Sequence, residues 1–514
     1  MTFPDAVALA AAIAATGLAD YRWWRVAQRE HYIAGSVTRF ALRWWVRLGP
    51  NRLLALAAVL GTVLAPVSPF TAIVGAVAVA IGPFRYPLRG RAPGPVAWTA
   101  RLRTVAAVTV ALQLIVVVLG AAVGATVPAA AVVALVSPLF IDAALALLRP
   151  VEEHKAERFV QQAKARLRQV DPLVIAITGS YGKTTTKSYA AHLIGAAKRV
   201  VPTPASFNNR AGLSKAVNEN LVPGTEVFIA EMGTYGQGEI AELCEWCPPE
   251  IAAITAIGPV HLERFGDEDA IVTAKSEIFG PAGTAVLNVD DARLAALATR
   301  LEGEGKRVQR VSATDPSADV RVAVVDGRMT VAVGGQQVAD VADPDAVPTN
   351  VAVAVALAVA AGVSPADLGP ALSSLPSVAN RRATATLSTG ATAIDDTFNS
   401  NPAGCRAALA MLARLSSAGH RRVVVTPGMV ELGPRQAEEN RLFATEAATT
   451  ATDIVVVGFT NRAALLAGVR AAPAEGRAAV VLADTHALAV EWVRGHTGTG
   501  DVVLYENQLP DHYP

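Results

Sequence analysis

The first 150 residues alternate between long apolar runs and short segments that carry arginine. No charged residue occurs in 53–84 or in 104–141, which are stretches of 32 and 38 residues. As single helices they would be about 48 and 57 Å long, against a bilayer core of about 30 Å. We therefore expect each run to fold back on itself at its prolines, near 66–69 and 126–128.

This pattern predicts a multi-pass α-helical transmembrane domain over residues 1–150. The expected spans are 4–19, 53–66, 70–84, 104–125 and 129–148. Arginines concentrate in 20–52 and 85–103 and are absent from the hairpin tips, so the positive-inside rule leaves the chain after Arg149 in the cytoplasm. The first hairpin is short for a bilayer, which suits a re-entrant loop. Buried helices of a soluble protein are the alternative.

Strand and helix patterns alternate from residue 171 onward. Apolar runs at 173–177, 226–230, 250–257 and 284–289 are separated by amphipathic stretches at 184–197, 212–221, 238–246 and 267–279. A second set of strand patterns lies at 391–395, 422–426, 453–458, 478–482 and 501–505. Such alternation is typical of α/β domains with mainly parallel sheets.

The patterns divide the chain into four regions. These are the membrane domain 1–150, a charged linker helix 151–170, a central α/β domain 171–378 and a C-terminal Rossmann-like α/β domain 379–514. Within the central domain, 317–340 predicts a β appendage. The apolar stretch 349–362 is too short to span a bilayer and predicts a core helix.

Composition and charge exclude two classes of protein. The net charge is +1, but residues 1–150 hold 13 Arg and 4 acidic residues (+9), which leaves −8 for the rest. Basic charge beside apolar runs suits a membrane surface, whereas a nucleic-acid partner would require a basic patch on a soluble domain. Three cysteines in 514 residues exclude a disulfide scaffold.

A glycine-rich loop follows the first strand pattern of the central domain. In such a loop, backbone N–H groups at a helix N-terminus bind phosphate oxygens, a lysine reaches the β- and γ-phosphates, and a hydroxyl can ligate Mg²⁺. The predicted ATP-binding residues are Gly179, Ser180, Gly182, Lys183, Thr184 and Thr185. The commonest nucleotide loop has glycine at the position of Ile177, so an ordinary strand-to-helix turn is the alternative.

The loop and further motifs together resemble the Mur ligase family, whose members join a carboxylate to an amine through an acyl phosphate. The further motifs occur in the family's order at 230–233, 237–240, 261–266, 274–279, 395–402 and 428–433. They are most similar to those of ligases that add D-alanyl-D-alanine to a muramoyl tripeptide. The resemblance covers residues 171–514 and implies a P-loop-type ATPase domain that uses ATP and two Mg²⁺ ions.

The resemblance implies catalytic and metal-binding roles for four residues besides the loop. Glu231 would bind one Mg²⁺ with Thr184, and His261 would bind a second. Lys275 would be carbamylated by CO₂, so that its anionic form can lie beside Mg²⁺. Arg381 would reach the γ-phosphate, although the neighbouring Arg382 leaves the register open. Catalysis would rest on Lys183, Lys275, His261 and Arg381.

The resemblance also implies residues that contact the adenine and the substrate. The adenine segment would include Asp396, Asn399 and Asn401, and the substrate loop Ser206, Asn208 and Asn209. On pattern alone, Glu231 could be a solvated strand end, His261 a packed or surface residue, and Lys275 a surface lysine. The segment 399–402 could equally be a loop before a helix.

The region before the phosphate loop departs from the family, whose members of this type begin with a domain that holds a UDP-sugar. We therefore expect a membrane-associated or polymeric carboxylate, such as a lipid-linked cell-wall precursor, and an amino acid or dipeptide as the amine. The ligase domains would lie at the cytoplasmic face of the inner membrane. The alternatives are a soluble muramoyl-tripeptide substrate, amidation with a glutaminase partner, and a non-catalytic ATP-binding membrane switch.

Overall fold

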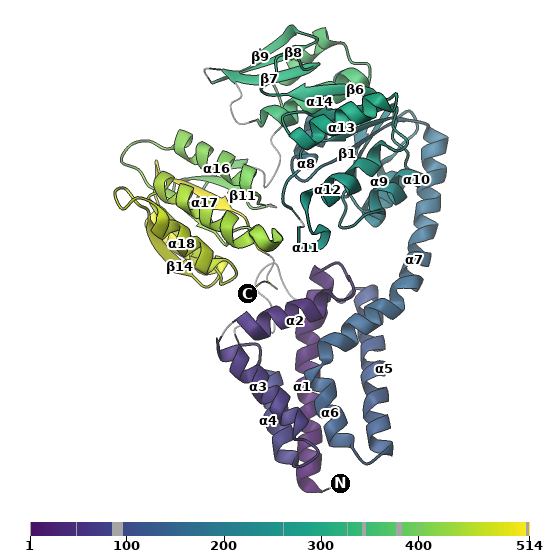
Figure 1. The fold of residues 1–514 in the computed structure, drawn as a ribbon, viewed down its shortest axis with the longest axis vertical. Coiled ribbons are helices and arrows are strands. Elements are labelled where there is room, and N and C mark those ends of the chain that lie inside the picture. Colours follow the sequence, from purple (N-terminus) through teal and green to yellow (C-terminus); the bar gives the residue numbers. More distant parts are fainter. Residues whose placement is uncertain are drawn as a thin grey trace. The chain divides into compact units, whose positions relative to one another are not determined.

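The chain forms two compact units in a computed structural model. Unit 1 comprises Met1–His154 with Leu509–Pro514, and unit 2 comprises Lys155–Gln508. Unit 1 is helical and unit 2 is α/β (Figure 1). The structure describes residues 2–47, 49–84, 96–260, 262–325, 327–341, 346–376, 383–398, 400–509 and 513, and only the backbone of Arg47 and Glu263.

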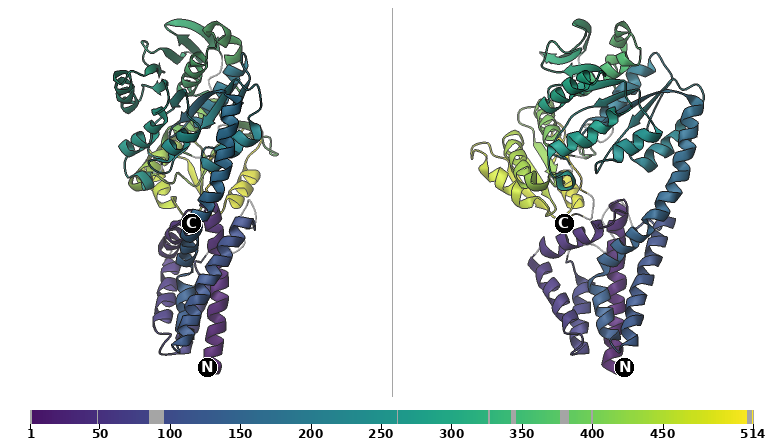
Figure 2. Two further views of the ribbon diagram at one scale, coloured as in Figure 1. Left: turned by 90° about the vertical axis from the view of Figure 1, so that its right-hand side faces the viewer. Right: turned by 45° about the vertical axis from the view of Figure 1, so that its right-hand side comes forward.

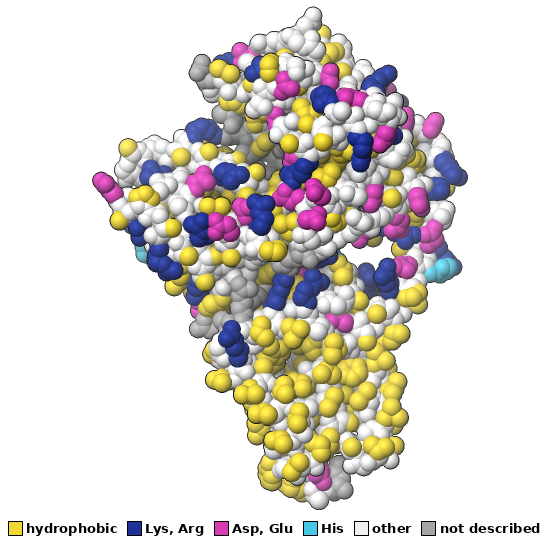
Figure 3. Space-filling view, viewed as in Figure 1, with side chains coloured by type: hydrophobic (Ala, Val, Ile, Leu, Met, Phe, Trp, Pro, Cys, Tyr) yellow, Lys and Arg dark blue, Asp and Glu magenta, His cyan; other side chains and the backbone are white. Residues whose placement is uncertain are grey.

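Unit 1 is a bundle in which most helices run side by side and one short helix crosses the direction of the others (Figure 2). They are α1 (Phe3–Arg29), α2 (Ser36–Arg47), α3 (Gly49–Val63), α4 (Pro69–Ile81), α5 (Ala100–Ala122), α6 (Thr126–Leu135) and α7 (Ser137–Val170), which continues into unit 2. Apolar side chains cover the face of unit 1 seen in Figure 3. Small residues let the helices approach closely, since a Cβ on Gly61 of α3 would lie 2.6 Å from Cα of Gly75 in α4.

Two helices of the described residues are long and apolar enough to cross a membrane, namely α1 and α5. The pair α6 and α7 passes the same test only when counted as one span, and it bends by 75° between the two helices. The helices of the first hairpin, α3 and α4, have 15 and 13 residues and are shorter than a bilayer requires. The described helices therefore include two candidate spans, or three with the bent pair, and α3 and α4 have the short length that suited a re-entrant loop.

The first helix is longer than the predicted span 4–19, because it continues to Arg29. Arg22 lies in this extension and is buried. Its guanidinium donates hydrogen bonds to the carbonyls of Val79, Ala80 and Gly82 at the C-terminal end of α4. Carbonyl groups at a helix end lack partners within the helix, so a buried arginine can satisfy them.

The second apolar run folds back close to the predicted position, at a turn between Ala122 and Thr126, but it also has a second break that was not predicted. Pro128 lies in the first turn of α6, where a proline is tolerated, and the turn before it contains Gly124 with φ +75°. The second break follows Leu135, just before Pro138 in the first turn of α7. The predicted linker helix is not separate, because α7 passes through Pro150 without interruption.

The larger sheet of unit 2 has the strand order β2-β3-β1-β4-β5-β6-β7-β8-β9. Its strands are β1 (Leu173–Thr178), β2 (Val200–Pro202), β3 (Val227–Glu231), β4 (Ile251–Ile254), β5 (Thr284–Asn288), β6 (Arg307–Ser312), β7 (Val320–Val325), β8 (Arg328–Val333) and β9 (Gln336–Val341). Neighbours from β2 to β7 are parallel, whereas β7, β8 and β9 pair antiparallel. The predicted β appendage is thus an antiparallel extension of the sheet.

Helices cover both faces of this sheet. Ile175 and Ile177 of β1 pack with α8 (Lys183–Gly195) and α14 (Pro348–Ala360), whereas Val174 and Ala176 pack with helices on the other face. Those helices include the unit 2 part of α7, α9 (Arg210–Asn220), α10 (Glu239–Trp246), α12 (Glu268–Ser276) and α13 (Ala292–Gly303). The predicted core helix near 349–362 is confirmed, since α14 is buried from Val351 to Ala358. Short helices α11 (Leu262–Phe265) and α15 (Leu368–Leu372) complete this part.

The smaller sheet has the order β10-β11-β15-β12-β13-β14. Its strands are β10 (Ala383–Thr386), β11 (Thr392–Asp396), β12 (Arg422–Thr426), β13 (Asp453–Val457), β14 (Ala479–Ala483) and β15 (Val502–Glu506). The accompanying helices are α16 (Pro402–Leu415), α17 (Gln436–Thr450), α18 (Arg462–Ala471) and α19 (His486–His496). All pairs are parallel except β10–β11, which agrees with the predicted α/β class.

Candidate active site

The phosphate loop joins β1 to α8 at the carboxyl edge of the larger sheet, where open α/β sheets bind ligands. Gly179 and Gly182 have φ angles of +149° and +77°. A Cβ at Gly179 would lie 2.0 Å from the hydroxyl oxygen of Thr255, and one at Gly182 would lie 2.3 Å from Oδ1 of Asn350. Both positions therefore require glycine on conformational and steric grounds. The helix that follows presents unpaired N–H groups toward an anion.

Two predicted loop residues make contacts that fix the loop. The Lys183 ammonium donates to the Gly179 carbonyl at 2.7 Å, so it lies over the loop at the start of α8. The hydroxyl of Ser180 donates to the Gly258 carbonyl at 3.2 Å and accepts from the Gly258 N–H at 3.1 Å. The loop after β1 is thereby tied to the segment after β4.

Glu231 ends β3 and is 1% exposed, so it is not the solvated strand end that the pattern alone left open. Its Oε2 accepts from the Thr184 hydroxyl at 3.0 Å and from the Lys187 ammonium at 2.9 Å. Its Oε1 accepts from the Asn208 amide at 3.1 Å. The structure therefore brings together the predicted loop hydroxyl, the predicted metal ligand and one residue of the predicted substrate loop.

Lys187 is a site residue that the sequence reasoning did not single out. It lies one turn after Lys183 on α8, is 4% exposed, and also donates to the carbonyl of Ala205. Ala205 belongs to the loop after β2 and has φ +42°, in the left-handed region that non-glycine residues seldom adopt. The signal that could have identified Lys187 is its spacing, because residues i and i+4 share one helix face.

The geometry around Glu231 suits a divalent cation. Carboxylate and hydroxyl oxygens are the ligands that Mg²⁺ prefers, and Mg²⁺ takes few ligands from protein when phosphates and water supply the others. Among the described residues, no three His, Cys, Asp or Glu side chains cluster to hold a metal ion. A Mg²⁺ ion at Glu231 would therefore be held by Thr184, phosphate and water in addition to the carboxylate.

Lys275 lies in the last turn of α12 and is 3% exposed, so it is not a surface lysine. Burial lowers the pKa of its ammonium well below the ordinary value, and the positive charge of Lys183 lowers the pKa further. Both effects favour the neutral amine. A neutral amine is a nucleophile, which is the form that reacts with CO₂.

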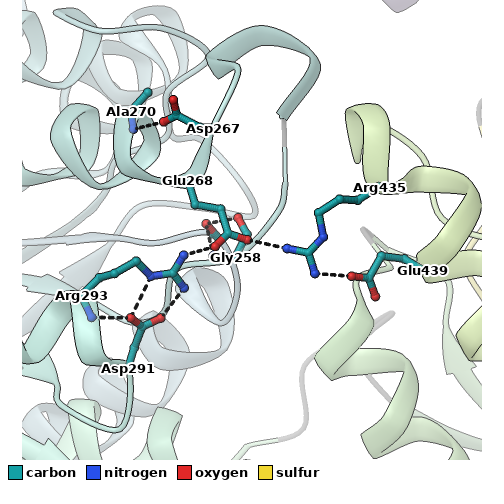
Figure 4. Close-up of polar contacts among 9 residues, drawn as sticks. Gly258, Asp267, Glu268, Ala270, Asp291, Arg293, Arg435 and Glu439 are labelled. Carbon is teal, nitrogen blue, oxygen red and sulfur yellow. Dashed lines mark hydrogen bonds and ion pairs between the residues drawn. The ribbon is translucent and has the colours of Figure 1, made fainter.

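A chain of charged side chains lies near the loop (Figure 4). Glu268, at the start of α12, pairs with Arg293 and, at 3.1 Å, with Arg435; Arg435 also pairs with Glu439 of α17. Arg293 in turn pairs with Asp291 at 2.7 Å. This network connects the segment after β12 to the helix that carries Lys275.

Tyr181 of the phosphate loop lies close enough to this network for its charges to affect the phenol. Its phenol is buried, and burial raises its pKa, with the charges of Glu268 and Glu439 raising it further. A Cβ at Gly258 would lie 2.0 Å from the phenol oxygen, so the chain passes directly against the ring. The tyrosine is thus held neutral between the loop and the segment after β4.

The predicted C-terminal residues are only partly described. Arg381, Arg382 and Asn399 lie outside the described residues, as does His261 in the central domain. Asn401 caps α16, since its Oδ1 accepts from the Gly404 N–H at 2.9 Å, and Asp396 ends β11. These contacts account for Asn401 structurally and leave its predicted contact with adenine as a prediction.

The remaining predicted residues occupy loops and helix starts. Asn209 caps α9 by accepting from the Gly212 N–H at 2.9 Å, Thr185 lies in the first turn of α8, and Ser206 lies in the loop after β2. Two side-chain amides hydrogen-bond to the backbone of the motif at 428–433. Asn440 and Asn461 both donate to the carbonyl of Met429, at 2.9 Å in each case.

Comparison with known proteins identifies the family of the two α/β domains. Models of the Mur ligase middle domain and of the Mur ligase glutamate ligase domain match residues 177–338 and 381–505. The UDP-N-acetylmuramoyl-tripeptide–D-alanyl-D-alanine ligase of Mycobacterium tuberculosis is 32% identical over 374 residues, which are 64% of this chain and 69% of that protein.

Two solved structures extend the comparison to the fold. MurF from Acinetobacter baumannii superposes with a TM-score of 0.58 and 25% identity, covering 69% of this chain and 77% of the other. MurF from Thermotoga maritima, solved with ADP, gives a TM-score of 0.56 and 23% identity over 69% and 80%. The chain therefore belongs to the Mur ligase family, and like the family's members it is an ATP-dependent ligase that forms amide bonds.

Proposed function

We propose that the protein joins the carboxylate of a muramoyl peptide to the amine of D-alanyl-D-alanine. The observation that carries this proposal is the contact of Thr184 with Glu231, beside Lys183 at the start of α8. This arrangement places a phosphate-binding loop beside a carboxylate that can bind a metal ion, at the carboxyl edge of a parallel sheet. The choice of substrates rests on the similar ligases from M. tuberculosis and A. baumannii.

The proposed reaction has two steps. A carboxylate oxygen attacks the γ-phosphorus of ATP and ADP leaves, which produces an acyl phosphate. The amine nitrogen then attacks the acyl carbon, loses a proton and expels phosphate. The Lys183 ammonium and the N–H groups at the start of α8 would stabilise the negative charge that the phosphates bring together.

A Mg²⁺ ion, when bound at Glu231 and Thr184, would neutralise phosphate charge. Lys187 would hold the Glu231 carboxylate in place from the other side, at 2.9 Å. We further propose that Lys275 is carbamylated, since the amine is buried and favoured in its neutral form. Its carbamate would add a negative charge that offsets the positive charge of Lys183.

We also propose that unit 1 holds the enzyme in the inner membrane, with the ligase domains in the cytoplasm. The apolar helices α1 and α5 support this location, together with the arginines that flank them. A membrane location makes a lipid-linked form of the muramoyl peptide a second candidate for the carboxylate. Soluble UDP-N-acetylmuramoyl-tripeptide is the first candidate because the similar ligases are named for it.

The test is phosphate release by the full-length protein with each carboxylate in turn. We expect release to require both UDP-N-acetylmuramoyl-tripeptide and D-alanyl-D-alanine, with a product of the corresponding mass. Turnover with the lipid-linked form alone would favour the second candidate. Phosphate release that needs no amine would contradict the proposal and favour an ATP-driven switch. Lys183→Ala, which removes the loop ammonium, should abolish release in every case.

A further inference from the structure

The end of strand β15 carries two residues, Glu506 and Asn507, to which neither the proposed reaction nor the motifs shared with Mur ligases assign a role. β15 lies between β11 and β12 in the smaller sheet and is parallel to both. The chain that leaves β15 therefore lies between the chain that leaves β11 and the chain that leaves β12. The first of these neighbours is the adenine segment, residues 396–401, and the second leads into the motif at 428–433.

Glu506 is the last residue of β15 and pairs in register with Asp396 at the end of β11. It is 0% exposed. Its Oε1 accepts hydrogen bonds from the Ser400 hydroxyl at 2.6 Å and from the Cys405 thiol at 3.2 Å. Ser400 belongs to the adenine segment, and Cys405 lies in the first turn of α16. The carboxylate therefore fixes the chain on both sides of Asn401, which caps that helix.

The chemistry of this cluster suits an anchor for the segment and not a nucleophile. Burial raises the pKa of the Cys405 thiol well above its ordinary value, and the charge of Glu506 raises that pKa further. The thiol therefore keeps its proton and can donate a hydrogen bond to the carboxylate. A buried carboxylate is costly unless it is hydrogen-bonded, and hydrogen bonds to a charged acceptor are stronger than neutral ones. Glu506 thus stabilises one position of the segment that it contacts.

Asn507 extends these contacts to the segment after β12. Its N–H donates to the Asp396 carbonyl at 3.0 Å, and the next N–H, of Gln508, donates to the Thr397 carbonyl at 3.1 Å. Its side-chain amide donates to the Gly428 carbonyl at 2.7 Å. Asn507 has φ +67°, a left-handed conformation that asparagine adopts more readily than most residues. One residue therefore connects the adenine segment to the start of the motif at 428–433.

We propose that Glu506 and Asn507 are positioning residues for the nucleotide base, because they hold the adenine segment in its binding conformation before ATP arrives. The inference rests on the proposed function and on the predicted contact of residues 396–401 with adenine. Ligands of open α/β sheets bind at the carboxyl ends of the strands, which is where these contacts lie. A segment that is already fixed loses less conformational entropy when it binds a ligand. The two residues act through the segment and need not touch the base.

The experiment measures the dissociation constants of ADP and GDP, each with Mg²⁺, for the full-length protein by isothermal titration calorimetry. Both nucleotides carry the same ribose and diphosphate, so the ratio of their dissociation constants reports on the base. We expect the wild type to bind ADP more tightly than GDP. Glu506→Ala removes two hydrogen bonds that fix the segment, so it should weaken ADP binding about tenfold and change GDP binding little. Glu506→Gln keeps an acceptor oxygen for the Ser400 hydroxyl and should retain most of the preference for ADP.

Asp453 is the matched control, because it is a buried acid at the opposite edge of the same sheet. It begins β13, is 7% exposed and pairs with Arg421. Asp453→Ala should lower the thermal stability and leave the ratio for ADP and GDP unchanged.

Two further variants separate the base from the phosphates and guard against misfolding. Cys405→Ala removes one donor to Glu506 without altering the segment, so it should weaken ADP binding about threefold, whereas Cys405→Ser keeps a donor and should not. Lys183→Ala acts on the phosphates and should weaken both nucleotides alike. If Glu506→Ala does not fold, the comparison of Cys405→Ala with Cys405→Ser decides.

Three outcomes would overturn the inference. They are an unchanged ratio in the alanine variants of Glu506 and Cys405, an equal fall of the ratio in Asp453→Ala, and a wild type that binds ADP and GDP equally well. If the wild type binds neither nucleotide, the proposed function itself is wrong and the positioning role falls with it. Binding of ADP that depends on Lys183, combined with an unchanged ratio in Glu506→Ala, would contradict the positioning role alone.

Discussion

Glu231 is the residue at which three segments of the central domain meet. Thr184 and Lys187 reach it from α8, and Asn208 reaches it from the loop after β2. Because the carboxylate is buried, each partner contributes more than it would in water. The arrangement positions the proposed metal ligand before any nucleotide arrives.

Lys187→Met should destabilise the protein by about 3 kcal/mol, because removing one partner of a buried ion pair leaves the other charge uncompensated. Added Mg²⁺ should recover part of this loss, since it can replace the ammonium beside Glu231. The measurement is the free energy of unfolding in urea, followed by tryptophan fluorescence of unit 2, with and without Mg²⁺.

Lys215→Met is the matched control for that experiment. Lys215 lies on α9 in an exposed pair with Glu219 at 3.9 Å, and such surface pairs contribute at most about 1 kcal/mol. Equal destabilisation of the two variants, or no effect of Mg²⁺ on Lys187→Met, would show that Lys187 has no special relation to the Glu231 site.

Lys275→Ala should lose nearly all ligase activity and regain part of it when a short carboxylate such as acetate is added. The reason is that the added anion can occupy the volume and supply the charge of the proposed carbamate. Activity is measured as amine-dependent phosphate release, and Lys183→Ala, which lacks a cation instead of an anion, should gain nothing from acetate. Full activity of Lys275→Ala without any supplement would eliminate the carbamate proposal.

At the scale of elements, the strands and helices that carry the site could be predicted from the sequence. The buried runs before the phosphate loop and before Glu231 are continuous apolar segments, as parallel strands buried on both faces require. Strands β2 and β6 were missed. β2 has three residues, and β6 begins with exposed or half-buried positions, so neither shows a buried run.

The helices of unit 1 were harder to predict, because prolines and arginines that usually mark the end of a helix lie within helices there. Pro128 suggested a break and a boundary was predicted between the last span and a linker helix at 151, yet Pro128 lies in the first turn of α6 and α7 continues through Pro150. Arg22, which seemed to lie beyond the first span, is instead buried within α1 and donates hydrogen bonds to carbonyls near the end of α4. Such tertiary partners leave no periodic signal in the sequence.

Arg435 and Glu268 provide a prediction at this scale, because their ion pair joins the segment before α17 to α12. Arg435 is half-exposed, so the pair should contribute about 1 kcal/mol or less to stability. Arg435→Ala should therefore unfold almost like the wild type while its turnover falls up to about fivefold, since α12 carries Lys275. The comparison is steady-state turnover beside thermal unfolding.

Arg441→Ala is the control for this prediction. Arg441 pairs with Glu438 at 2.7 Å within α17 itself, so its loss removes a similar contact without disconnecting two elements. We expect its turnover to equal that of the wild type. If Arg435→Ala and Arg441→Ala behave alike, the contact between Arg435 and Glu268 has no part in catalysis.

At the scale of the whole molecule, the chain joins a Mur ligase pair of domains to a unit of apolar helices. The ordered motifs of residues 171–514 predicted the ligase part, because their combination and order resemble those of the Mur ligase family and models of that family match residues 177–338 and 381–505. The substrate could not be predicted in the same way. A soluble and a lipid-linked carboxylate would be distinguished by the residues that contact the substrate. Sequence periodicity predicts helices and strands but does not predict which residues make those contacts.

The most direct test of the account follows oxygen from the carboxylate substrate. UDP-N-acetylmuramoyl-tripeptide labelled with ¹⁸O in its terminal carboxylate is turned over by the full-length protein with ATP and D-alanyl-D-alanine, and the released phosphate is analysed by mass spectrometry. Activation through an acyl phosphate predicts that one ¹⁸O atom passes into each phosphate released, because phosphate leaves with an oxygen of the substrate. Product formation with unlabelled phosphate would contradict it.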